Sequence, residues 1–68
     1  MQIAVKLNGE RRSFDRNMTI LRLLEMLKIP PGSIVVEHNR KILYKDMFEH
    51  TILEDGDELE LIRFVGGG

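Results

Sequence analysis

The feature that most constrains this chain is one segment of helical periodicity set among segments with the two-residue period of strands. Its apolar residues are spaced i, i+3, i+4 and i+7, at Ile20, Leu23, Leu24 and Leu27. This spacing places an apolar stripe on one helix of about three turns. Thr19 is expected to cap the first turn, and Pro30, Pro31 and Gly32 are expected to stop the helix. Strands must therefore supply the rest of the core.

Several other segments are predicted to be β-strands. The first alternates so that Ile3, Val5 and Leu7 share one face, and the dipeptide Asn8-Gly9 suits a type I′ turn into the second. Residues 45–53 have no clean period and are expected to connect two strands, with one turn of helix. The strands are predicted at residues 2–7, 10–14, 34–37, 41–44 and 58–65.

One helix among these strands indicates an α+β fold with two layers. We expect a ubiquitin-like β-grasp, in which a mixed sheet of four to five strands carries one main helix packed across one face. In that arrangement the first and last strands are neighbours in the middle of the sheet. The domain is expected to span residues 1–65, and residues 66–68 to form a flexible glycine tail.

The composition excludes several classes of function. The chain has no cysteine, so disulfides, thiolate metal sites and a thiol nucleophile are excluded. It has no nucleophile elbow and no phosphate-binding glycine loop. Its two histidines lack the spacing of metal ligands, and we expect His38 to be partly buried and His50 to be exposed. The net charge of -1 argues against nucleic-acid binding, and no apolar run could span a membrane. We expect a cytoplasmic protein, monomeric when free, that is not an enzyme.

The most unusual feature is the run of three glycines, Gly66, Gly67 and Gly68. At the average glycine usage such an ending arises by chance in about 0.03% of chains. A disordered end is the plain alternative. Residues without a Cβ can follow a narrow channel, so Gly66 and Gly67 are predicted to thread into a partner's active site. The carboxylate of Gly68 could there be adenylated and then attacked by sulfur, which leaves a thiocarboxylate.

The folded body beside this tail is expected to present an apolar patch to partner proteins. If Leu59 and Leu61 point into the core, alternation turns Ile62 and Phe64 outward on the open face of the sheet. We predict that Ile62, Phe64 and Val65 dock partner enzymes. The alternative is that the helix or a loop covers this surface.

Five motifs are spread along the whole chain. They are Met1-Gln2-Ile3, the helix start Thr19-Ile20-x-x-Leu23-Leu24, Val36-Glu37-x-Asn39, Glu54-Asp55-Gly56-Asp57 and Val65-Gly66-Gly67-Gly68. Together they resemble the ThiS family, the sulfur carriers of thiamine biosynthesis. Arg22 departs from the acidic residue often found in that helix turn, a difference that concerns helix capping and not the terminus.

The resemblance implies a β-grasp protein that is a substrate and not a catalyst. A ThiF-type adenylyltransferase would activate Gly68 with ATP and Mg²⁺, and a cysteine desulfurase or sulfide would supply the sulfur. A ThiG-type thiazole synthase would accept it, and the carrier itself would bind no cofactor. The nearest alternative is MoaD, the small subunit of molybdopterin synthase, which shares the Asp-Gly-Asp turn and the terminal glycines. A ubiquitin-like protein modifier and a non-covalent interaction module are further alternatives.

Overall fold

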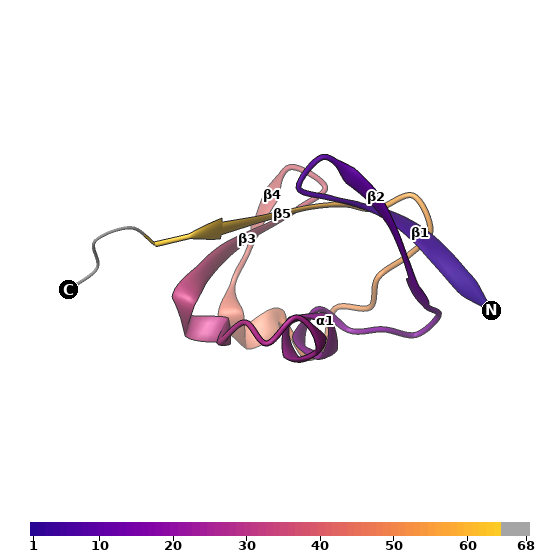
Figure 1. The fold of residues 1–68 in the computed structure, drawn as a ribbon. Helices are drawn as coiled ribbons and strands as arrows, with labels where there is room; N and C mark the ends of the chain where they lie inside the picture. The colour runs from indigo at the N-terminus through magenta and orange to yellow at the C-terminus, as the bar shows by residue number, and fades with distance from the viewer. Residues whose placement is uncertain (65–68) are drawn as a thin grey trace.

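The computed structural model of the chain describes residues 1–64, which form a five-stranded mixed sheet covered on one face by a helix. The strand order is β2-β1-β5-β3-β4, with β1 and β5 parallel and the other neighbours antiparallel. The first and last strands are therefore adjacent, as the β-grasp prediction requires (Figure 1). The strands are β1 (Gln2–Leu7), β2 (Glu10–Asp15), β3 (Ile34–His38), β4 (Lys41–Leu43) and β5 (Glu58–Arg63).

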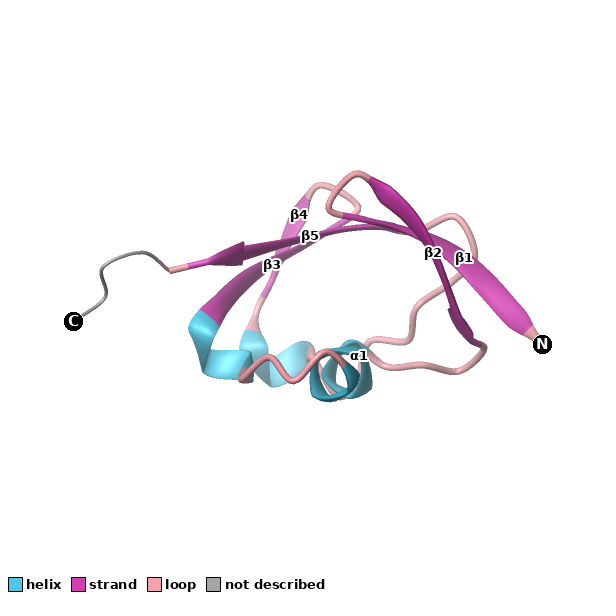
Figure 2. Cartoon of the chain, viewed as in Figure 1, coloured by secondary structure: helices cyan, strands magenta, loops and turns pink. Residues whose placement is uncertain are grey.

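The second layer consists of α1 (Ile20–Met26) and two short 3-10 turns, η1 (Pro31–Ser33) and η2 (Lys45–Met47). All three lie on the same side of the sheet (Figure 2). The turn at η2 is the single helical turn predicted within residues 45–53. Apolar side chains from the two layers meet in one core: Ile3, Val5, Leu7, Phe14, Met18, Ile20, Leu23, Leu24, Ile34, Val36, Phe48, Leu53 and Leu59.

The two ends of α1 differ in how well the sequence predicts them. At its start the hydroxyl of Thr19 accepts a hydrogen bond from the Arg22 amide at 3.1 Å, which confirms the predicted cap. At its end the helix stops at Met26 and is about two turns long, so the prediction that the prolines stop it was wrong. Lys28 takes a left-handed conformation with φ 60°. This allows the amides of Lys28 and Ile29 to bond back to the carbonyls of Glu25 and Leu24.

All five strands begin where predicted, β1 also ends there, and the ends of the other four differ from the prediction by one or two residues. Asn8 and Gly9 both have positive φ, at 49° and 84°, which confirms the type I′ turn. The last strand was predicted to span residues 58–65, and β5 ends at Arg63. Val65 and the glycine tail at 66–68 lie outside the described residues. Among residues 1–64, no helix is long and apolar enough to cross a lipid bilayer.

Candidate functional site

The candidate site begins where β5 leaves the sheet. This strand lies between β1 and β3, and it carries the chain out beyond the helix layer (Figure 1). Its pairing with β3 continues one residue past the strand, because the Phe64 amide donates to the Ser33 carbonyl at 3.2 Å. The residues that follow therefore start from a fixed point on the sheet. The site residues Val65, Gly66, Gly67 and Gly68 lie outside the described residues.

The two predicted docking residues that the structure describes are both open to solvent. Leu59 is buried and Leu61 is half-buried, on the core face of the sheet. Ile62 is 46% exposed and Phe64 is 61% exposed. Neither the helix nor a loop covers them, so the alternative of a covered strand end was wrong.

The apolar surface extends across two more strands than the sequence indicated. Val35 lies directly opposite Ile62 on β3 and is half-buried. Ile42 on β4 is 56% exposed, and Tyr44, two residues further along an extended backbone, is 70% exposed. We call these five residues the open-face patch: Val35, Ile42, Tyr44, Ile62 and Phe64. The alternation within residues 41–44 pairs Ile42 with Tyr44, but only the strand register places them on the same face as Ile62.

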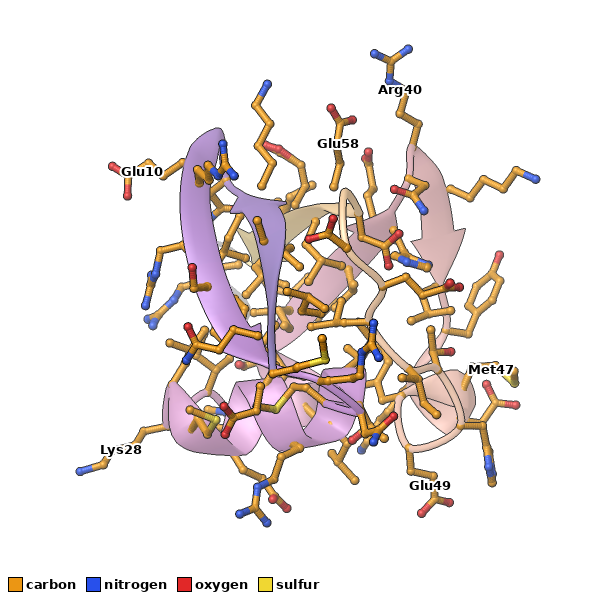
Figure 3. All side chains as sticks on the ribbon, turned by 90° about the vertical axis from the view of Figure 1, so that its right-hand side faces the viewer. Glu10, Lys28, Arg40, Met47, Glu49 and Glu58 are labelled. Atoms are coloured by element: carbon orange, nitrogen blue, oxygen red, sulfur yellow. The ribbon has the colours of Figure 1, made fainter. Side chains whose placement is uncertain are left out.

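Carboxylates border this patch. Glu60 lies directly opposite Glu37 in the β3–β5 ladder, and neither forms an ion pair with another residue of 1–64 within 4.0 Å. Glu58 lies two residues before Glu60 on β5 and forms a weak ion pair with Arg40, at 3.8 Å. The side chains of Glu58 and Arg40 project from the sheet side of the molecule, and Lys28 and Glu49 project from the helix side (Figure 3). The apolar patch is therefore flanked by two like charges.

A polar cluster holds the start of β5. His38 Nε2 lies 2.8 Å from Asp57 Oδ2, and Asn39 donates to Asp57 Oδ1 at 3.1 Å. The Glu54 amide also donates to Asp57, at 2.9 Å. Burial by itself raises the pKa of Asp57, but the hydrogen bonds from His38, Glu54 and Asn39 outweigh it and hold that pKa below its ordinary value. This cluster fixes the turn that leads into β5.

The histidines have the roles predicted for them. His38 is part of this cluster and is half-buried, and His50 is exposed. Within the part of the chain that the structure describes, no three His, Asp or Glu side chains are grouped so that they could hold a metal ion.

Comparison with known proteins places the chain in a family. The model of the ThiS family matches residues 5–68, a range that includes the second half of β1, all of α1 and β5, and the terminal glycines. This chain belongs to the ThiS family. Four of the five motifs described above lie within the matched region, and Met1-Gln2-Ile3 precedes it.

Some relatives of this ThiS family member are about as long as this chain, and others are much longer. The sulfur carrier protein ThiS of Bacillus subtilis is 32% identical over 65 residues, which cover 94% of this chain and 98% of that protein. The thiazole synthase of Paramagnetospirillum magneticum is 39% identical over 62 residues, and that of Magnetococcus marinus is 30% identical over 64 residues. The chain spans only 19% and 20% of the length of these two proteins.

A solved structure of the ThiS family shares the whole fold. The crystal structure of the thiamine biosynthesis protein ThiS from Geobacter metallireducens superposes with a TM-score of 0.84 at 30% identity. The superposition covers 97% of this chain and all of that one. The ubiquitin-like β-grasp prediction is therefore confirmed.

Proposed function

We propose that this ThiS family member is a sulfur carrier of thiamine biosynthesis, and that its reactive group is the carboxylate of Gly68. The observation that carries the proposal is the family match, which extends from residue 5 within β1 to Gly68. The near-complete mutual coverage with the sulfur carrier protein ThiS of Bacillus subtilis supports it. The same matches favour the thiamine pathway over a molybdopterin carrier.

The proposed chemistry has two steps. First, the Gly68 carboxylate attacks the α-phosphorus of ATP on a ThiF-type adenylyltransferase with Mg²⁺, and pyrophosphate leaves. Second, a sulfur nucleophile attacks the acyl carbon of the adenylate, the C–O bond to AMP breaks, and a thiocarboxylate forms. With sulfide as donor, hydrosulfide supplies the sulfur and releases its proton. A cysteine desulfurase is the proposed sulfur source in the cell. Its cysteine persulfide is reduced by thiols, which form a disulfide, and the sulfur is released as the hydrosulfide that attacks the adenylate. The proposed compartment is the cytoplasm.

The open-face patch is the proposed docking surface for both partner enzymes. A compact apolar surface with exposed aromatic residues, beside the point where the reactive chain emerges, suits the core of a protein interface. The border of Glu37 and Glu60 favours a partner surface with lysine or arginine at its edge. A ThiG-type thiazole synthase is the proposed acceptor, because proteins named thiazole synthase contain a segment similar to this chain.

The proposal is tested by intact-mass spectrometry. The protein is incubated with ATP, Mg²⁺, sulfide and its adenylyltransferase, beside a variant that lacks Gly68. The expected result is a mass gain equal to the exchange of one oxygen for sulfur, found in the parent protein and absent from the variant.

Two other outcomes would point to other functions. Suppose that the adenylyltransferase releases pyrophosphate from ATP when a known carrier is supplied, but this protein gains no mass. That result would overturn the proposal and favour a non-covalent interaction module. Higher-mass conjugates through lysine, formed in place of the thiocarboxylate, would favour a protein modifier.

A further inference from the structure

Asn8 makes a contact with β5 that the hairpin turn does not need. Its side-chain Oδ1 accepts a hydrogen bond from the Leu61 amide at 2.7 Å, and its Nδ2 donates weakly to the Leu61 carbonyl at 3.5 Å. The two residues are 53 positions apart in the sequence. Because a carboxamide carries both an acceptor and donors, it can pair with one residue of a strand as a neighbouring backbone would.

The position of this contact is where the β1–β5 ladder ends. The Lys6 amide donates to the Asp57 carbonyl at 2.9 Å, and the Asn8 amide donates to the Leu59 carbonyl at 2.8 Å. In a parallel ladder with this even spacing, the next bond would run from the Leu61 amide to the carbonyl of residue 8. The backbone of Asn8 has already turned, with φ 49°, and its side chain supplies the acceptor instead.

A second asparagine does the same at the other end of β5. Asn39 is the first residue of the β3–β4 turn and has φ 52°. Its Oδ1 accepts from the Glu58 amide at 2.9 Å, while its own amide donates to the Glu58 carbonyl at 2.8 Å. The two hairpin turns thus hold β5 through matching asparagines, Asn39 at its start and Asn8 near its exit.

We propose that Asn8 is a positioning residue for the reaction of Gly68, an inference that rests on the proposed carrier function. From Leu61 onward, β1 has ended and only β3 pairs with β5 through its backbone. A strand end bonded on one side opens locally more often than one bonded on both. The Asn8 carboxamide supplies the second side at Leu61, so the strand end that precedes the tail is held in one position for the partner enzyme.

The consequence concerns conversion more than docking. Only molecules whose strand end is in place can pass the tail to the partner productively. Loss of one hydrogen bond of ordinary strength lowers the ratio of ordered to open strand ends about fivefold, so the ordered fraction falls by up to that factor. Docking falls less, because Val35, Ile42 and Tyr44 lie outside this strand end and only Ile62 and Phe64 move with it.

The test uses three full-length variants. Asn8→Gly keeps the positive φ, since glycine accepts it and a Gly-Gly pair supports the same turn, but it removes the carboxamide. Asn8→Asp restores the acceptor for the Leu61 amide. Asn39→Gly is the matched control, because it removes the equivalent carboxamide from the start of the same strand.

Three quantities are measured for each variant. They are kcat/KM for thiocarboxylate formation by the adenylyltransferase with sulfide, the Kd of the same enzyme for forms that lack residues 66–68, and Tm. We expect Asn8→Gly to lower kcat/KM by up to about fivefold, by a larger factor than it raises Kd, and Asn8→Asp to recover most of the loss. Asn39→Gly should lower Tm at least as much and leave kcat/KM near the parent value.

The inference is overturned if Asn8→Gly converts at the parent rate, if Asn39→Gly slows conversion equally, or if Asn8→Asp is no better than Asn8→Gly. In all three cases the parent protein is still converted, so the proposed function stands. Failure of the parent protein to be converted would overturn the proposed function, and this inference with it.

Discussion

His38 Nε2 lies 2.8 Å from the carboxylate of Asp57, and this contact joins the end of β3 to the turn that precedes β5. The two residues are 19 positions apart and come from the motifs Val36-Glu37-x-Asn39 and Glu54-Asp55-Gly56-Asp57. The carboxylate also accepts from Asn39 and from the Glu54 amide. These two motifs therefore act in the fold, where they place the first residue of the strand that leads to the glycine tail.

The lowered pKa of Asp57 predicts a stability that depends on acid pH. The unfolded chain takes up this proton near the ordinary value of 3.8, and the folded chain takes it up only at lower pH. The stabilisation is therefore present above about pH 4 and is lost as the pH falls through the folded pKa. Asp57→Asn should cost about 1 to 2 kcal/mol at pH 7, because a charged hydrogen-bond acceptor is lost.

Urea unfolding of the parent protein and Asp57→Asn from pH 7 to pH 3 measures this effect. The difference in the free energy of unfolding should shrink toward acid pH, since the unfolded parent chain takes up a proton at Asp57 before the folded chain does. A difference that stays constant over the range would contradict the assignment of the pKa to this cluster.

The Thr19 cap predicts a defined loss of stability. Thr19→Ala removes the acceptor of the Arg22 amide and should lower the free energy of unfolding by about 1 kcal/mol. In a domain of this size that corresponds to about 4 to 8 °C in Tm. Thr19→Ser keeps the hydroxyl and serves as the control in calorimetry. Equal loss in both variants would show that the methyl group and not the cap matters.

The open-face patch predicts which substitutions weaken docking. Truncation of a buried interface anchor typically costs 2 kcal/mol or more, so Phe64→Ala and Ile62→Ala should each raise Kd for the adenylyltransferase by about 30-fold. Both side chains are exposed in the free protein, so Tm should change little. Met26→Ala is the matched control, because Met26 is 55% exposed on the helix layer. Titration calorimetry would count against the patch if all three variants bound equally.

The pairing of Glu60 with Glu37 predicts a stabilising substitution. Like charges directly opposite each other across two strands repel, so Glu60→Gln should raise the free energy of unfolding by about 0.2 to 1 kcal/mol. The gain should fall as salt is added, because both side chains are reached by solvent ions. Glu25→Gln on the exposed face of α1 removes the same charge without this neighbour. An equal gain in that variant would attribute the effect to net charge.

The local elements of the fold follow from local signals. The period of Ile20, Leu23 and Leu24 predicts the helix, Thr19 its start, and Asn8-Gly9 the first turn, because each depends on neighbours within a few residues. The end of α1 was not predicted, because the residue that ends it carries no local signal for doing so. Lys28 takes the left-handed position that glycine usually fills, and its side chain gives no signal that it does so.

The sequence by itself determined the α+β class, the order of the elements, the outward direction of Ile62 and Phe64, and membership of the ThiS family through motifs over the whole chain. The β-grasp expectation places β1 beside β5, but only the tertiary structure decided that β3 is its other neighbour, with β4 beyond, and in which register they pair. That placement brings Ile42 and Tyr44 to the same face as Ile62, sets Glu37 against Glu60, and brings Asn8 to Leu61. These contacts join residues far apart in the chain, and strand register, which depends on packing of the whole core against α1, fixes them.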